Sequence, residues 1–168
     1  NNTYEESKCR AEHLVYSYRN KFNIYILRPS VIIGNSLTGR AMTDYSVYGI
    51  YHLFTKLKQI TSDLNERLRY TIKNDIQLNT IPVDFVCHAF LAALHYGEKN
   101  KIYNVVVDSP PFVSSLLHII KDVTAFDQLD IVYEEVLNPS KPERIFLRNI
   151  KTLEDYLFHG IHFQNNNL

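Results

Sequence analysis

Apolar residues recur along this chain with two periods, one typical of helices and the other of strands. Residues 3–20 carry apolar side chains at helical spacing, namely Cys9, Ala11, Leu14, Val15 and Tyr18. A short β-branched and aromatic run follows at Ile24–Leu27 and predicts a buried strand. Arg28–Pro29 is expected to end that strand, because proline has no N–H to give to a strand ladder.

The same alternation continues towards the end of the chain. Helices are predicted over residues 45–60, 85–96, 112–123 and 152–159, and strands near 68–72, 102–107 and 129–136. Asp84 is expected to be the N-cap of the second of these helices, and Gly97 is placed to stop it. Thr152 and Asp155 form a weak capping box for the last one. Strands that alternate with helices indicate an α/β fold with parallel strand pairing.

Composition and charge narrow the class of protein. Hydrophobic residues make up 45% and charged residues 21% of the chain, as in ordinary globular proteins. The net charge is zero, so nothing indicates nucleic acid or an anionic membrane as a partner. No apolar run approaches the roughly 18 residues of a membrane span, and no signal peptide is visible, so a cytoplasmic protein is expected. Cys9 and Cys87 both lie in predicted helices, which indicates reduced thiols.

The candidate chemistry begins with Tyr4 and Lys8. They lie four residues apart, so a helix would place both on one face. An ammonium beside a tyrosine favours the phenolate, which makes Tyr4 a candidate general acid or base. The spacing alone is common, and the alternative is that both are ordinary solvated residues of a helix.

The residues after this pair follow a recognisable order. The predicted strand ends in Arg28-Pro29-Ser30, and the run Gly34-Asn35-Ser36-Leu37-Thr38-Gly39 comes next. Val83-Asp84 opens the later helix, and Tyr103-Asn104-Val105 lies in the strand after it. This order resembles the extended short-chain dehydrogenase/reductase family, and within it the thioester reductases and fatty acyl-CoA reductases of the NAD-binding, male-sterility type. The resemblance runs through the whole chain, but only to the C-terminal half of a family member.

The resemblance implies the C-terminal part of a Rossmann-like doubly wound fold with a small α+β substrate-binding lobe. The 168 residues would form a single domain or fragment. Residues 1–34 and 84–107 would supply its Rossmann-side elements, residues 35–83 and 108–163 its substrate-side lobe, and residues 164–168 a frayed tail.

The resemblance also implies an activity, namely the NAD(P)H-dependent reduction of an acyl thioester (acyl-CoA or carrier-bound) to an aldehyde or alcohol. Tyr4 would give the proton, and Lys8 would lower its pKa and hold the nicotinamide ribose. Backbone groups of Pro29, Ser30 and Val31 would flank the nicotinamide. The residues expected to border the substrate are Asn35, Ser36, Thr38, Arg40 and Tyr48.

The sequence also gives expectations for the cofactor and for the binding partners. Five glycines form no Gly-rich dinucleotide fingerprint, so NADP or NAD is expected to bind only together with an N-terminal half. Whether this chain is itself an enzyme therefore stays open. The expected partner is a small-molecule acyl thioester, and self-association through an exposed sheet edge is a further expectation. A carrier protein could meet the basic cluster Lys141, Arg144, Arg148 and Lys151.

Two other functions remain open. A nucleotide-sugar epimerase or dehydratase of the same superfamily would use the same tyrosine and lysine, although such enzymes tend to carry Gly-Pro where this chain has Gly34-Asn35. A non-catalytic interaction domain could retain the fold. No metal site is predicted, because neither His88 with His95 nor His159 with His162 has the spacing of a metal-binding motif.

Overall fold

The computed structural model describes residues 3–62, 66–73 and 76–157, with side chains as far as Lys151. The chain divides into two compact units. Unit 1 comprises the described residues of Asn1–Gly39 and Ile81–Asp108, and unit 2 comprises those of Arg40–Thr80 and Ser109–His162.

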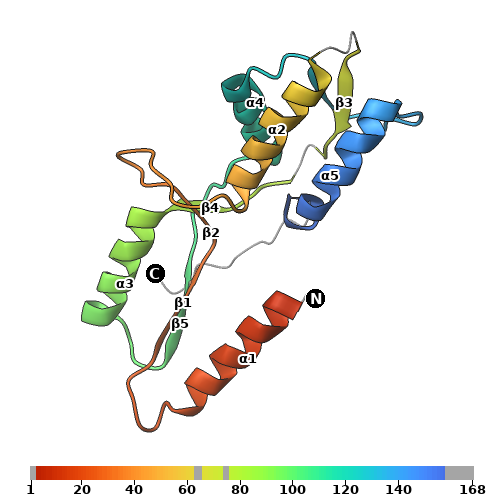
Figure 1. Cartoon of the computed structure of the whole chain (residues 1–168). Helices are drawn as coiled ribbons and strands as arrows, with labels where there is room; N and C mark the ends of the chain where they lie inside the picture. Colours follow the sequence, from red (N-terminus) through yellow and green to blue (C-terminus); the bar gives the residue numbers. More distant parts are fainter. Residues whose placement is uncertain (1–2, 63–65, 74–75, 158–168) are drawn as a thin grey trace. The chain divides into compact units, whose positions relative to one another are not determined.

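A parallel strand pair organises unit 1 (Figure 1). β1 (Tyr25–Pro29) pairs with β5 (Lys101–Val105), from Tyr25 opposite Lys101 to Pro29 opposite Val105. The predicted parallel pairing is confirmed, and the strand ends within the predicted Arg28–Pro29 stop, at Pro29, two residues beyond the predicted run to Leu27. Proline is tolerated at the last position because the ladder bond there comes from the Ser30 N–H, which donates to the Val105 carbonyl at 3.0 Å.

Two helices contact opposite faces of this pair (Figure 1). Successive strand residues point to opposite sides. Leu27 packs towards α3 (Val83–Tyr96), in a small core with Val86. Its neighbour Arg28 pairs instead with a residue of α1 (Thr3–Ser17), the carboxylate of Glu12. None of the residues of α1 is buried, so this helix has little apolar contact with the part of the chain that the structure describes.

The start of α3 differs from the prediction, and its end agrees with the prediction. The helix begins at Val83 with Pro82 as its N-cap, so the prediction that Asp84 caps it is wrong. A short strand, β4 (Thr80–Pro82), runs directly into the helix and pairs with β2 (Val31–Ile33), which places Asp84 inside the first turn. Gly97 ends the helix as predicted, but in an extended conformation with φ −69°.

Unit 2 is built from three helices and a second parallel strand pair (Figure 1). Its described elements are α2 (Val47–Thr61), β3 (Leu68–Thr71), α4 (Val113–Thr124), β6 (Leu129–Val132) and α5 (Lys141–Leu157). β3 pairs with β6, and the predicted helices near 45–60 and 112–123 are confirmed. Aromatic rings join these elements: the ring centroids of Phe54 and Phe126 lie 6.0 Å apart, and those of Tyr70 and Phe146 lie 5.1 Å apart.

The last helix begins eleven residues earlier than the sequence pattern predicts, because a stronger cap lies upstream. The Ser140 N–H donates to Glu143 Oε2 at 2.7 Å, and the Glu143 N–H faces Ser140 Oγ at 3.4 Å. This is a reciprocal capping box. Pro142 is compatible with the first helical turn, where its missing N–H has no intrahelical partner. Thr152 therefore lies in the helix interior, and its predicted role as a cap is wrong; the predicted tail at 164–168 lies outside the described residues.

Glu143 also joins α5 to β3. Its carboxylate accepts hydrogen bonds from the Arg69 N–H at 2.9 Å and from Arg69 Nε at 2.8 Å. The Glu143 residue is 1% exposed. The hydrogen bond from Arg69 outweighs the cost of burial and lowers the pKa of Glu143 from 4.5 to about 2.

Nothing in the described part of the chain is both apolar and long enough to serve as a membrane-crossing helix.

Replacing Glu143 tests this junction. We expect Glu143→Gln to lower the free energy of unfolding by about 2 kcal/mol at pH 7, because the amide keeps the shape but loses the charge-assisted bonds. Since the folded-state pKa is depressed, this stabilisation is present above pH 4.5 and is lost as the pH falls through about 2. Urea unfolding at pH 7 and near pH 2 measures both effects. Glu135→Gln, which alters an exposed carboxylate, is the control. An equal loss of stability at both pH values would contradict the account.

The close approach at Gly97 gives a second test. A Cβ at this position would lie 2.4 Å from the Ala93 carbonyl oxygen, so Gly97→Ala must displace the end of α3. We expect a loss of about 1–3 kcal/mol in urea unfolding, as for other overpacked positions. Gly49→Ala is the matched control, because a Cβ there meets only the Asp44 carbonyl oxygen at 3.4 Å, and it should be neutral or slightly stabilising.

Candidate functional site

Tyr4 and Lys8 lie in the first half of α1, one turn apart. The Lys8 ammonium lies over the Tyr4 ring, with Nζ 5.5 Å from the ring centroid. This is the distance of a cation–π contact. Tyr4 is 61% exposed, and among the described residues no hydrogen bond to its hydroxyl occurs. The structure therefore brings the predicted pair together on the surface of unit 1, with the phenol accessible.

An ion pair holds α1 against β1. Arg28 Nε donates to Glu12 Oε2 at 3.0 Å, and Arg28 Nη2 contacts the other carboxylate oxygen. This hydrogen bonding lowers the pKa of Glu12 and raises the pKa of Arg28. A fork of two parallel bonds fixes direction as well as distance. It therefore orients the helix that carries Tyr4 relative to the strand, in a pairing 16 residues apart that the sequence pattern did not indicate.

The residues predicted to flank a nicotinamide lie at the junction of the first two strands. Pro29 is the last residue of β1 and Val31 is the first of β2, with Ser30 between them. The Ser30 Oγ atom is buried, and no hydrogen-bond partner for it exists in the part of the chain that the structure describes. A buried hydroxyl without a partner costs free energy, so this atom is a candidate for contact with a bound polar group.

The predicted substrate residues of unit 1 form a closed turn. Asn35 Oδ1 accepts hydrogen bonds from the N–H groups of Leu37 at 3.1 Å and Thr38 at 3.0 Å, and from the Thr38 hydroxyl at 3.1 Å. Ser36 binds Asp84 through both its N–H and its hydroxyl. The polar side chains expected to face the substrate are thus engaged within the protein.

The two remaining predicted substrate residues belong to unit 2. Arg40 is exposed, and Tyr48 is half-buried in the first turn of α2. Both make contacts within the protein. Their part in a site stays a prediction.

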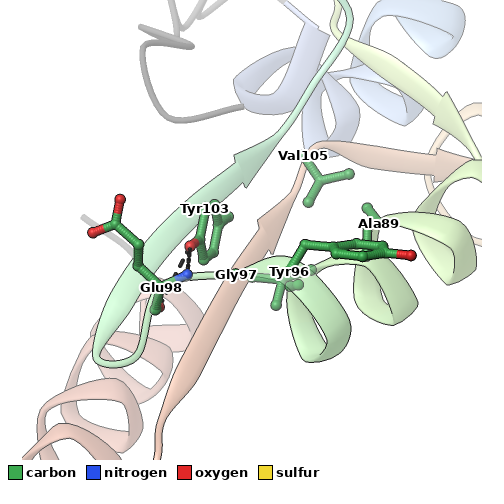
Figure 2. Close-up of a pocket in the computed structure, with 9 residues that line it drawn as sticks. Ala89, Tyr96, Gly97, Glu98, Tyr103 and Val105 are labelled. Atoms are coloured by element: carbon green, nitrogen blue, oxygen red, sulfur yellow. Dashed lines mark hydrogen bonds between the residues drawn. The ribbon is translucent and has the colours of Figure 1, made fainter.

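An apolar groove of about 290 Å³ lies between α3 and the strand pair (Figure 2). Tyr96 and Ala89 of α3 face Tyr103 and Val105 of β5 across it, and the Tyr103 hydroxyl accepts a hydrogen bond from the Glu98 N–H at 2.7 Å. None of the residues predicted for the site lines this groove. The groove and the Tyr4–Lys8 pair therefore lie on different surfaces of unit 1.

Metal ligands are not gathered in the described ranges. No three histidine, cysteine or acidic side chains come together there in a way that could hold a metal ion. His159 and His162 lie outside the described residues. Cys9 and Cys87 are free and exposed.

Comparison with solved structures shows the fold. RMD from Pseudomonas aeruginosa, solved with NADPH, superimposes with a TM-score of 0.53 at 21% identity, over 98% of this chain and 52% of that one. The dTDP-glucose 4,6-dehydratase of Bacillus anthracis, solved with NAD, gives 0.54 at 14% identity, over 90% and 46% of the two chains. The UDP-N-acetylglucosamine 4-epimerase of Bacillus cereus gives 0.52 at 14% identity, over 85% and 49%.

These matches confirm the Rossmann-like α/β fold, and the chain spans about half the length of the solved structures it matches. A comparison with curated protein sequences found no match to this chain. An NAD-binding family model described as male sterility protein matches residues 1–90, which include the Tyr4–Lys8 pair, both strands of the Pro29 junction and Asp84. More than half of the chain is covered, and the chain belongs to the NAD-binding male sterility protein family.

Proposed function

We propose that this chain is part of an NAD(P)H-dependent oxidoreductase that reduces an acyl thioester, bound to CoA or to a carrier, to an aldehyde or alcohol. Membership of the NAD-binding male sterility family supports the coarser statement, an oxidoreductase with a nicotinamide cofactor. The finer statement is supported by the run from Gly34 to Gly39, which resembles the corresponding run of thioester reductases and fatty acyl-CoA reductases.

The observation that carries the proposal is the Tyr4–Lys8 pair. The phenol is accessible, and the ammonium already lies against its ring. The pair therefore places a cation beside a tyrosine whose side chain is accessible to a substrate. The Glu12–Arg28 ion pair holds the helix that carries both residues.

The chemistry assigned to this chain is proton transfer and positioning. The nicotinamide, when bound, supplies the hydride. Tyr4 donates a hydrogen bond to the substrate carbonyl oxygen and then gives its proton to that oxygen as charge develops there. Lys8 stabilises the phenolate that is left.

The residues present fit a nicotinamide cofactor in part. Lys8 is an exposed cation beside the phenol, and Ser30 presents a buried hydroxyl without a partner among the described residues. We infer that Lys8 and the Pro29–Val31 junction contact the cofactor. The backbone cradle for its phosphates would come from an N-terminal half, because no Gly-rich fingerprint occurs in these 168 residues. The choice between NAD and NADP would depend on that half.

A second candidate is a nucleotide-sugar epimerase or dehydratase. It is favoured by the solved structures with this fold, which include a dTDP-glucose 4,6-dehydratase and a UDP-N-acetylglucosamine 4-epimerase. The Tyr4–Lys8 pair would serve such an enzyme equally well. The substrate of the working enzyme separates the two, as turnover of a nucleotide sugar in place of an acyl thioester would favour this candidate.

Replacing Tyr4 tests the mechanism. In the chain joined to its N-terminal half, we expect Tyr4→Phe to lower kcat for acyl-CoA-dependent NADPH oxidation by roughly 10²- to 10⁴-fold, the usual contribution of a positioned general acid. The fold should be unchanged, because the hydroxyl is exposed and has no hydrogen-bond partner in the described structure.

Tyr18→Phe is the matched control for this substitution. Tyr18 is 46% exposed and has the Lys21 ammonium 5.9 Å from its ring centroid, so it reproduces the local contact of Tyr4 at another place. Its replacement should leave kcat unchanged. Equal activity of Tyr4→Phe and wild type would show that the mechanism is wrong. Absence of turnover by wild type with any acyl thioester and with any nucleotide sugar would favour a non-catalytic interaction domain.

Partner binding is a further part of the proposal. In the part of the chain that is described, β1 and β5 pair only with each other, so both have an edge at which another strand could pair. We expect the isolated chain to self-associate in light-scattering measurements and to become monomeric when the N-terminal half is added.

A carrier protein would meet the exposed positions Lys141, Arg144, Arg148 and Lys151 of α5.

A further inference from the structure

The turn formed by Asn35–Gly39 is internally rigid. Its first side chain accepts three hydrogen bonds from Leu37 and Thr38, as described above. The Gly39 N–H closes the turn by donating to the Asn35 carbonyl at 2.8 Å. Gly39 has φ +66°, a conformation that costs a residue with a side chain free energy. The turn therefore moves as one body, and its position depends on whatever holds that body from outside.

Asp84 holds it. Ser36 N donates to Asp84 Oδ1 at 2.8 Å, and the Ser36 hydroxyl donates to Asp84 Oδ2 at 2.6 Å. Both carboxylate oxygens are used, by two donors of a single residue 48 positions away. Two bonds between the same pair fix orientation as well as distance. The Ser36 bonds lower the pKa of Asp84, so the carboxylate is in its charged, accepting form near neutral pH.

This arrangement differs from the usual work of an acidic residue at a helix start. Aspartate near a helix N-terminus is commonly placed to accept bonds from the first N–H groups of its own helix. The Asp84 side chain, in the first turn of α3, binds a residue outside its helix, Ser36 in the turn after β2. Because β2 and β4 are paired, this contact ties the two chain segments that leave the pair, one into the turn and the other into the helix.

We propose that Asp84 is a positioning residue for the substrate, acting through the Asn35–Gly39 turn. The inference rests on the proposed function, in which this turn borders the acyl thioester. Asn35 and Ser36 contribute through the brace that sets the turn, because their side-chain oxygens are already bonded within the protein. The side chain that the braced turn presents is Leu37, which is apolar and 90% exposed, a chemistry that suits the acyl portion of the substrate.

The test compares three substitutions that remove different parts of the contact. Asp84→Ala removes both hydrogen bonds. Asp84→Asn keeps an oxygen for the Ser36 N–H and an amide N–H to which the hydroxyl can turn, so it is the conservative rescue variant. Ser36→Ala keeps only the backbone bond. Asp122→Ala, at an exposed position of α4, is the matched control.

Two readouts are combined. Hydrogen exchange on the chain measures protection of the Ser36 amide, which should be lost in Asp84→Ala and retained in Asp84→Asn. Steady-state kinetics of the assembled enzyme with acyl-CoA and NADPH should show about a 10-fold or greater fall in kcat/KM for the acyl substrate in Asp84→Ala, as for other small displacements of a bound reactant. The KM for NADPH should not change. The kcat/KM of Ser36→Ala for the acyl substrate should lie between those of Asp84→Ala and wild type. The kcat/KM of Asp122→Ala should match that of wild type.

The outcomes separate this inference from the proposed function. If wild type turns over acyl-CoA, and Asp84→Ala loses amide protection but keeps wild-type kcat/KM, the positioning role is overturned while the proposed function stands. Unchanged amide protection in Asp84→Ala overturns the brace itself. A wild-type enzyme without activity on any acyl thioester overturns the proposed function and this inference with it. Should Asp84→Ala fail to fold, Ser36→Ala decides on kcat/KM for the acyl substrate, and a wild-type value in the folded Ser36→Ala enzyme overturns the positioning role.

Discussion

The parallel pairing of β1 with β5 is the constraint on which unit 1 depends. Parallel strands cannot be joined by a tight turn, so the chain must cross from the end of one strand to the start of the next. Here the crossing includes all of α3 and the excursion through residues 40–80. Once the pair forms, successive residues of β1 point to opposite faces, Leu27 towards α3 and Arg28 towards α1. Because β1 ends at Pro29, the Ser30 hydroxyl lies at the junction with β2, and the turn follows β2.

Carboxylates with distant partners connect the elements that surround the strands. Glu12 binds Arg28 and joins α1 to β1, and Asp84 binds Ser36 and joins α3 to the turn after β2. Glu143 does the same for α5 and β3 in unit 2. Each of these groups is held by more than one hydrogen bond, which restricts orientation. The apolar cores pack α3 and α5 against their strands, whereas α1 has no buried residue and is joined to β1 through the Glu12–Arg28 pair.

The two described surfaces of unit 1 have different chemical character. The α1 surface carries an accessible phenol with an ammonium beside it, which suits proton transfer. The groove under α3 is mainly apolar, and of the hydroxyls of its two tyrosines, Tyr96 and Tyr103, that of Tyr103 accepts a hydrogen bond from the Glu98 N–H. Within unit 1, the accessible phenol and ammonium therefore lie on the α1 side of the strand pair, and the apolar groove lies on the α3 side.

Local chemistry in the sequence determined the alternation of helices and strands, the parallel pairing and the Tyr4–Lys8 pair, because helical period, β-branched runs and a four-residue spacing act between near neighbours. The start of α5 is also encoded locally, since Ser140 and Glu143 have the spacing of a capping box, a stronger cap than the pattern at Thr152. The contacts of Asp84 with Ser36 and of Arg28 with Glu12 arise only in the folded chain. These partners lie 48 and 16 residues apart, and no local propensity records which distant donor a carboxylate meets once the strands have paired.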